Sequence, residues 1–126
     1  MERSTRNRIL VVDDEEDVRE ALGKILEKED FEVETASGVD EALELAARKR
    51  FDLVITDLIM PTASGLTLLL RLRASKADLP VIVMTAYGNW DSYLEAMDLG
   101  VADYLTKPLK RDEIVGRVRS SLATKR

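Results

Sequence analysis

The 126-residue chain contains neither cysteine nor histidine. The absence of cysteine excludes a disulfide framework, a thiolate metal site and a cysteine nucleophile. The absence of histidine excludes imidazole metal ligands, histidine acid–base catalysis and a phosphohistidine on the chain itself. Chemistry at this protein must therefore use carboxylates, hydroxyls and lysines, or groups that a partner supplies.

Long apolar runs are also missing. No stretch approaches the length of a membrane span, and the N-terminus carries no apolar secretory core. We therefore expect a cytoplasmic protein that does not contact a membrane. Basic residues are fewer than acidic ones, since the chain has 19 lysines and arginines and 24 aspartates and glutamates. The net charge of -5 disfavours nucleic acid as a direct ligand.

The composition that remains is typical of one globular domain, with 45% apolar and 34% charged residues. We expect residues 8–123 to form this domain. Three arginines lie among the first eight residues, and we expect residues 1–7 to be a solvated, flexible tail. Residues 124–126 are expected to be a second short tail or the start of a linker.

Short apolar runs alternate along the chain with stretches in which apolar residues recur at helical spacing. The runs predict five strands, at residues 9–12, 31–35, 53–56, 81–84 and 102–106. Helical spacing predicts five helices, around residues 18–26, 39–46, 66–72, 90–99 and 114–122. Gly100 is expected to form a left-handed cap after the fourth helix. Strand–helix units joined by right-handed crossovers predict an α/β fold, with a parallel sheet covered by helices on both faces.

Isolated polar residues follow four of these strands. Asp13 and Asp14 come after the first strand, Asp57 after the third, Thr85 after the fourth and Lys107 after the fifth. In an open parallel sheet, ligands bind at the carboxyl ends of the strands, near the topological switch point. Burial of such groups is costly unless a metal or an anion neutralises them. The pattern therefore predicts an active site at one edge of the sheet.

Each of these residues also has a purely structural interpretation. The acidic pair can cap a helix, Asp57 can form an Asx turn, Thr85 can fill a strand and Lys107 can lie on the surface. The functional interpretation instead assigns all of these residues to one site. Carboxylates bind a hard cation such as Mg²⁺, and an aspartate beside a metal can attack phosphorus. A hydroxyl and an ammonium then bind the oxygens of the transferred phosphoryl group.

Four short motifs follow the strands in order: Asp-Asp after the first, Asp-x-x-Met-Pro after the third, Thr-Ala after the fourth and Lys-Pro after the fifth. Over about residues 8–123, this set resembles the receiver domain of two-component response regulators. The resemblance implies a flavodoxin-like, doubly wound, five-stranded parallel sheet in the order 2-1-3-4-5 with five helices. The run Met84–Gly88 is most similar to receivers of the nitrogen-regulatory type.

The resemblance also implies a metal site around the phosphoacceptor, Asp57. Asp14 and Asp57 would bind Mg²⁺, or alternatively Mn²⁺, directly, and Asp13 would assist through water. The backbone carbonyl of Ile59 would be a further ligand. Many receivers have a polar side chain at this position, so the apolar Ile59 bears on the rate of dephosphorylation. We also expect the clustered carboxylates to raise the pKa of at least one of them.

The resemblance gives roles to residues of the fourth and fifth strands as well. Lys107 would contact the phosphoryl group, and the Lys107–Pro108 peptide bond would be cis. Thr85 and Tyr104 would be the switch pair, in which the hydroxyl turns toward the phosphoryl group and the aromatic ring turns inward. Tyr104 is equally compatible with an ordinary half-buried strand position. The fluorescence of Trp90, the only tryptophan, is expected to report this conformational change.

The implied function is phosphoryl transfer to Asp57 from a phosphohistidine on a sensor histidine kinase or phosphotransfer protein, or from a small acyl phosphate. No general base is required, since aspartate is ordinarily ionised at neutral pH. The chain would be a signalling switch rather than an enzyme, catalysing only its own phosphorylation and dephosphorylation. The fourth helix, fifth strand and fifth helix would pass the signal to an output domain or partner. Phosphorylation-dependent dimerisation is a further alternative.

Three other classes share part of this pattern. A haloacid-dehalogenase-type phosphatase also forms an aspartyl phosphate, but it requires an acid two residues after the nucleophile, where Ile59 lies. A flavodoxin-like electron carrier requires a hydroxyl-rich phosphate loop where Asp13, Asp14 and Glu15 lie. A pseudo-receiver, which is an interaction module without phosphorylation, usually lacks one key residue, and none is missing here.

Overall fold

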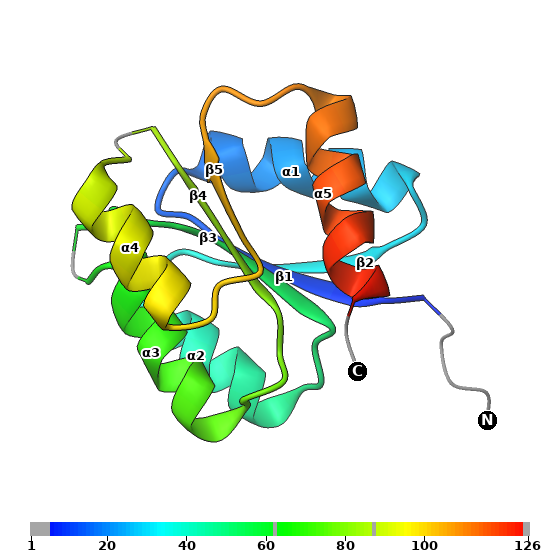
Figure 1. Cartoon of the computed structure of the whole chain (residues 1–126). Coiled ribbons are helices and arrows are strands. Elements are labelled where there is room, and N and C mark those ends of the chain that lie inside the picture. The colour runs from blue at the N-terminus through cyan, green and yellow to red at the C-terminus, as the bar shows by residue number, and fades with distance from the viewer. Residues whose placement is uncertain (1–5, 62, 87, 125–126) are drawn as a thin grey trace.

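The computed structural model describes residues 6–124 apart from Thr62 and Tyr87 (Figure 1). Tyr87 of the Met84–Gly88 run and residues 1–5 of the expected tail therefore lie outside the described residues. The strands are β1 (Arg8–Val12), β2 (Glu32–Ala36), β3 (Leu53–Asp57), β4 (Val81–Thr85) and β5 (Asp103–Thr106). The helices are α1 (Glu16–Lys28), α2 (Val39–Arg48), α3 (Gly65–Ser75), α4 (Trp90–Asp98) and α5 (Arg111–Ala123).

The five strands form one parallel sheet in the order β2-β1-β3-β4-β5. The predicted α/β fold, its strand order and its five helices are confirmed. The direction of winding reverses between β1 and β3, because the chain first adds β2 on one side of β1 and then crosses to the other side. Pairing between β1 and β3 runs to Val12 opposite Thr56, so both strands end at the same level of the sheet.

Helices cover both faces of the sheet, α1 and α5 on one and α2, α3 and α4 on the other (Figure 1). Successive residues of β1 serve the two faces: Ile9 packs in the cluster that contains Leu26 of α1, and Leu10 in the cluster that contains Leu68 of α3. Burial on both faces explains why this strand is a continuous apolar run in the sequence. None of the helices in the described part of the chain has the length and apolar character that a membrane crossing requires.

The second strand begins one residue later than the sequence predicts, at Glu32 rather than Phe31. Asp30 has a positive φ of 70° and turns the chain directly after α1. The sheet pairing starts where the N–H of Glu32 donates to the carbonyl of Asn7 at 2.9 Å. Phe31 is buried within the turn. A buried turn residue and a strand residue are both apolar, so the sequence pattern did not separate them.

The end of α4 agrees with the sequence prediction. Gly100 has a φ of 78°, which confirms the left-handed cap, and the N–H of Val101 donates to the carbonyl of Ala96 at 3.0 Å. The fifth strand begins at Asp103, one residue after the predicted start at Ala102. This cap directs the chain back into the sheet beside β4, and it thereby positions the residues that follow β5.

Candidate functional site

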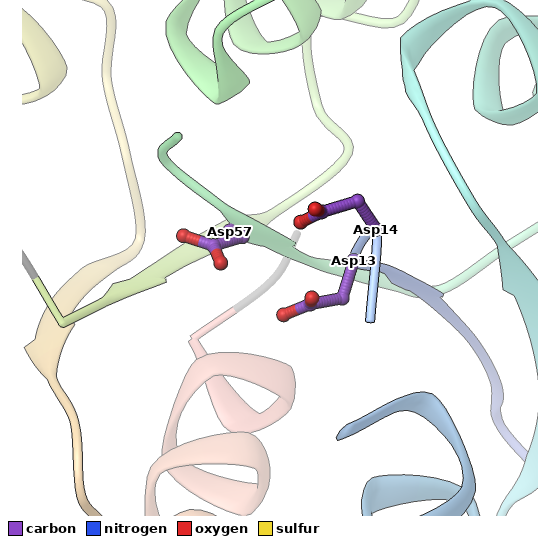
Figure 2. Close-up of side chains that lie close together, drawn as sticks. All are labelled: Asp13, Asp14 and Asp57. Atoms are coloured by element: carbon purple, nitrogen blue, oxygen red, sulfur yellow. The ribbon is translucent and has the colours of Figure 1, made fainter. Parts of the chain in front are cut away.

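Three aspartates converge at the carboxyl ends of β1 and β3 (Figure 2). Asp13 and Asp14 follow β1, and Asp57 is the last residue of β3. One carboxylate oxygen from each aspartate lies within 4.8 Å of the others. Asp13 is buried, Asp57 is partly buried and Asp14 is exposed. The register of β1 and β3 brings the three side chains together, although Asp57 is 44 positions after Asp13 and 43 after Asp14 in the chain.

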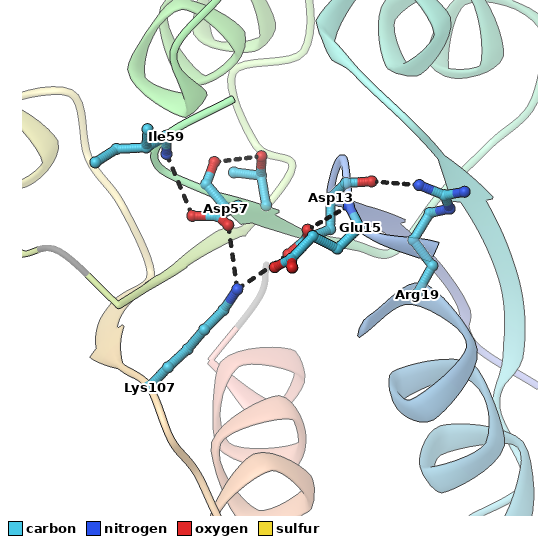
Figure 3. A network of polar contacts seen from close by, with 7 residues as sticks. Asp13, Glu15, Arg19, Asp57, Ile59 and Lys107 are labelled. Atoms are coloured by element: carbon cyan, nitrogen blue, oxygen red, sulfur yellow. Dashed lines mark hydrogen bonds and ion pairs between the residues drawn. The ribbon is translucent and has the colours of Figure 1, made fainter. Parts of the chain in front are cut away.

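The ammonium of Lys107 lies between two of these carboxylates (Figure 3). Its Nζ is 3.1 Å from Asp13 Oδ2 and 3.1 Å from Asp57 Oδ2. The backbone N–H of Lys107 donates to the carbonyl of Thr85 at 2.8 Å, which holds the segment after β5 against the end of β4. The Lys107–Pro108 peptide bond is cis, the isomer that the resemblance implies. The structure thus brings the predicted lysine into direct contact with two predicted acids.

The cluster is chemically suited to a divalent cation. Three carboxylates and one ammonium leave two negative charges in excess, which matches the charge of such an ion. Carboxylate oxygens are the ligands that hard cations such as Mg²⁺ prefer, and Mg²⁺ usually retains several waters. The exposed side chain of Asp14 leaves one side of the cluster open to solvent. The cluster of Asp13, Asp14 and Asp57 is therefore compatible with Mg²⁺ binding.

The pKa values of two groups in the cluster, Asp13 and Lys107, are both raised, but for different reasons. Burial raises the pKa of Asp13, although the N–H of Glu15 and the Lys107 ammonium act against it, and the charge of Asp57 adds a smaller upward effect. Burial alone would lower the pKa of Lys107, but its hydrogen bonds to Asp57 and Asp13 and the charges of these two carboxylates together outweigh burial and raise the pKa. The expected upward shift of one carboxylate pKa is confirmed, with burial rather than clustering as its main cause.

Asp13 is held on several sides. Its Oδ1 accepts a hydrogen bond from the N–H of Glu15 at 2.9 Å, and its backbone carbonyl accepts one from Arg19 Nη1 at 2.7 Å (Figure 3). The N-cap residue of α1 is Glu15, so Asp14 is not the helix cap that the structural interpretation allowed. Sequence reasoning missed Arg19. A cation one turn into a helix that follows an acidic pair is a weak signal, because it is equally typical of a solvated helix face.

The two oxygens of Asp57 have different partners. Oδ1 accepts a hydrogen bond from the backbone N–H of Ile59 at 3.2 Å, while Oδ2 faces Lys107 (Figure 3). The first contact is the Asx turn that the structural interpretation of Asp57 allowed. The Asx turn is therefore present, and it is compatible with the functional interpretation, because it directs the carboxylate toward the lysine and the other acids.

Gly65 is a second residue whose importance sequence reasoning missed. A Cβ at this position would collide with the backbone carbonyl of Asp57 and lie 3.1 Å from the Cα of Leu58. The N–H of Gly65 donates to the carbonyl of Leu58 at 2.7 Å. The start of α3 therefore packs directly on the backbone of the phosphoacceptor candidate, and only a residue without a side chain allows this approach.

An open depression of about 480 Å³ lies over these groups. Its lining includes the acids Asp14, Glu15 and Asp57, the ammonium-bearing Lys107, and the apolar residues Val18, Ile59, Met60, Pro61 and Ala86. Ile59 is 51% exposed. Acidic, basic and apolar side chains thus line one depression, which has room for a small ligand.

The proposed switch residues lie on the neighbouring strands. Thr85 ends β4 and is fully buried, and Tyr104 lies in β5 opposite Val83 of β4. The hydroxyl of Tyr104 is 2.7 Å from Oγ of Ser92 in α4. Its partly buried ring packs against the core cluster on that side of the sheet, as expected for a half-buried strand aromatic.

Comparison with known sequences points to one family. The family model described as "Response regulator receiver domain" matches residues 9–119. The response regulator protein PilR of Pseudomonas aeruginosa is 40% identical over 120 residues, which cover 95% of this chain and 26% of PilR. The response regulator MprA of Mycobacterium leprae is 40% identical over 115 residues, covering 91% of this chain and 50% of MprA. This chain therefore spans a quarter to a half of the length of these relatives.

Solved structures agree with this result. A CheY-like response regulator receiver domain protein from Methanospirillum hungatei has a TM-score of 0.92 at 26% identity, and the match covers 94% of this chain and 95% of that one. The response regulator TrrA of Thermotoga maritima, solved in complex with Mg²⁺–BeF, has a TM-score of 0.84 at 37% identity, covering 91% and 98%. The beryllofluoride-activated receiver domain dimer of NtrC4 has a TM-score of 0.87 at 29% identity, covering 92% and 96%.

These comparisons decide between the classes that share parts of the pattern. The family match runs through every predicted site residue from Asp13 to Lys107, and the structural matches cover nearly the whole fold. This outcome is at odds with both the haloacid-dehalogenase-type phosphatase and the flavodoxin-like electron carrier. The chain belongs to the family of response regulator receiver domains, the signalling switches of two-component systems.

Proposed function

We propose that this chain is a phosphoacceptor receiver, in which Asp57 accepts a phosphoryl group from a phosphohistidine on a sensor histidine kinase or phosphotransfer protein. The observation that carries the proposal is the placement of Lys107, whose ammonium lies 3.1 Å from both Asp57 Oδ2 and Asp13 Oδ2 beside a third carboxylate. A cation between two acids at the carboxyl ends of parallel strands is costly to assemble for stability alone. It is suited to binding the oxygens of a phosphoryl group.

The proposed metal site uses residues that lie in the cluster. Asp14 and Asp57 would hold Mg²⁺, or Mn²⁺, directly, with the backbone carbonyl of Ile59 as a further ligand and Asp13 acting through water. The bound ion would supply charge neutralisation for the phosphoryl oxygens. The two excess negative charges of the cluster support this assignment.

The proposed reaction is a direct displacement at phosphorus. A carboxylate oxygen of Asp57 forms the new bond to phosphorus while the bond from phosphorus to the donor's imidazole nitrogen breaks, and its electron pair stays on that nitrogen. An ionised carboxylate needs no general base, so the chemistry does not require a histidine in this chain. The Asx turn with Ile59 restrains the carboxylate, and Lys107 faces the charge that moves onto the phosphoryl oxygens. Attack of water on phosphorus then breaks the bond from phosphorus to the Asp57 oxygen, releases inorganic phosphate and returns Asp57 to its free carboxylate.

The proposed output is a population shift on the surface formed by α4, β5 and α5. Phosphorylation needs to contribute only a few kcal/mol of differential stabilisation to invert a two-state equilibrium. Thr85 and Tyr104 would be the switch pair, and the contact between Tyr104 and Ser92 of α4 supports a link between β5 and this surface. The receiving element would be an output domain or partner protein in the cytoplasm, for which the length of the relatives leaves room.

Two finer assignments accompany this proposal. A phosphorylation-dependent dimer is supported by the similarity to the activated NtrC4 receiver dimer. The likeness of the run Met84–Gly88 to receivers of the nitrogen-regulatory type supports that type for this chain. Neither assignment is needed for phosphoryl transfer to Asp57.

The proposal is tested by measuring the mass of the intact protein after incubation with Mg²⁺ and acetyl phosphate. We expect a gain of one phosphoryl group in the native protein, no gain in Asp57→Asn, and an unchanged gain in Asp98→Asn, which alters an exposed aspartate at the end of α4. If acetyl phosphate is not used, a panel of phosphorylated histidine kinases replaces it. Absence of phosphorylation by every donor would contradict the proposal and favour a pseudo-receiver.

A further inference from the structure

The hydroxyl of Tyr104 is joined to the first turn of α4. Its oxygen lies 2.7 Å from Oγ of Ser92, the third residue of that helix. Ser92 is 8% exposed, so the contact is largely shielded from water. Loss of a shielded hydrogen-bond partner is costly, because the remaining group is left unpaired. The contact therefore has the properties of a structural link between β5 and α4.

The other contacts of Ser92 favour Tyr104 as the donor of this hydrogen bond. Oγ of Ser92 donates to the carbonyl of Asn89 at 3.1 Å, and the backbone N–H of Asn89 donates to the same Oγ at 3.4 Å. A serine hydroxyl has a single proton, and that proton is already directed at Asn89. With its proton on Asn89, Ser92 accepts from Tyr104, whose phenolic O–H is then the donor. Ser92→Ala would take this acceptor away from Tyr104.

The partly buried ring of Tyr104 contacts other residues of the same region. Tyr93 meets it edge to face with the ring centroids 5.5 Å apart, and Trp90 stacks on Tyr93. A Cβ on Gly88 would lie 2.9 Å from the Tyr104 oxygen, so a side chain at this position would crowd the hydroxyl. Two features thus accommodate the ring in its inward position: Ser92 provides a hydrogen-bond partner for the hydroxyl, and Gly88 leaves space for it.

We propose that Ser92 is a positioning residue that holds Tyr104 in its inward position before phosphoryl transfer. The receiver would then be biased in advance toward the conformation that phosphorylation favours. This inference rests on the proposed function, because the switch role of Tyr104 does. One hydrogen bond contributes enough to change the ratio of inward to outward ring positions by about 2- to 12-fold. Phosphorylation would complete a shift that the Ser92 contact has already begun.

A purely structural role for Ser92 makes a different prediction. Ser92 also forms the capping box of α4 with Asn89, so Ser92→Ala alone could act by loosening the helix. Tyr104→Phe separates the two roles, because it removes the tyrosine hydroxyl and leaves the capping box intact. Ser92→Thr keeps a hydroxyl at position 92. Ser75→Ala is the matched control, since it removes a helical serine hydroxyl that bonds the carbonyl of Arg71 on an exposed face.

The first measurement is the position of the Tyr104 ring in the full chain by NMR, without Mg²⁺ or a phosphoryl donor. We expect strong nuclear Overhauser effects between the ring of Tyr104 and the side chain at position 92 in the native protein, in Ser92→Thr and in Ser75→Ala. The nuclear Overhauser effects between the aromatic ring at position 104 and Tyr93 should weaken to a similar extent in Ser92→Ala and in Tyr104→Phe. A Tyr104→Phe ring that stays fully inward would overturn the proposal and leave Ser92 as a helix cap only.

The second measurement is an NMR titration with beryllofluoride in excess Mg²⁺. Both Ser92→Ala and Tyr104→Phe should raise the apparent Kd by about 2- to 12-fold, and the double variant should show no further increase. Independent, additive effects would overturn the proposal. If the native protein does not bind beryllofluoride, the proposed function fails, whereas the ring position measured without it still decides the role of Ser92.

Discussion

Gly65 leaves the space that the backbone carbonyl of Asp57 occupies. A Cβ built on this glycine would collide with that carbonyl, and it would lie 3.0 Å from the carbonyl carbon. The glycine is the first residue of α3, so the helix begins in contact with the last residue of β3. The position of the proposed nucleophile thus depends on the absence of a side chain eight residues further along the chain.

Gly65→Ala should destabilise the protein and impair phosphorylation. The new methyl group meets backbone atoms that cannot rotate away, so α3 or the end of β3 must move. We expect a loss of about 1–3 kcal/mol in the free energy of unfolding, measured by urea denaturation, and slower phosphorylation of Asp57 by acetyl phosphate. Gly116→Ala is the control: nothing lies within 4 Å of its Cβ position in α5, so it should stabilise by about 0.5–1 kcal/mol. Equal effects of the two substitutions would contradict the close approach.

Mg²⁺ should stabilise the folded protein by mass action. At a Mg²⁺ concentration of about 100 times Kd, the gain is about 2.7 kcal/mol, which thermal melts with and without the ion resolve readily. Asp14→Asn should lose most of the gain, because it removes the most exposed acid of the cluster. Glu16→Gln in the first turn of α1 should keep the gain. Identical melting midpoints with and without Mg²⁺ in the native protein would contradict this prediction.

The raised pKa of Asp13 predicts how the metal-free protein responds to pH. Because the folded state favours the protonated form, it binds more protons than the unfolded state as pH rises from the ordinary pKa of aspartate to the raised value. The contribution of Asp13 to stability therefore decreases across that range and stays low at neutral pH. Urea denaturation in a chelator at pH 4 to 7 should show Asp13→Asn with a flatter profile than the native protein. A steeper profile in the variant would reverse the assigned sign.

Ile59 should slow the hydrolysis of the aspartyl phosphate. Its 51% exposed apolar side chain lies at the rim of the depression and offers no hydrogen bond to an attacking water. Ile59→Asn should shorten the lifetime of the phosphorylated form by about 2- to 12-fold, the effect of one added hydrogen bond in the transition state. Decay of the phosphorylated mass over time measures this lifetime. Leu70→Asn, at an exposed apolar position of α3, should leave it unchanged; an equal change there would point to a general surface effect.

Most of the fold and the main acids of the site followed from local patterns. Runs such as Leu53–Thr56 are apolar because both faces of the strand are covered, and this property needs no knowledge of partners. The carboxyl ends of parallel strands share one edge, so polar residues after separate strands were expected together. The start of β2 was misplaced by one residue, because the positive φ of Asp30 is a backbone property that apolar spacing does not encode.

By itself, the sequence determined the order of strands and helices, the class of fold, and the acids and lysine at the ends of the strands. Only the tertiary structure decided the contacts among them. Lys107 bonds Asp13 across 94 positions of chain, Gly65 approaches a backbone carbonyl, and the hydroxyl of Ser92 meets that of Tyr104 on another element. Local periodicity reports whether a residue is covered. It does not report the distance or direction of a partner, because these depend on how the separate elements pack.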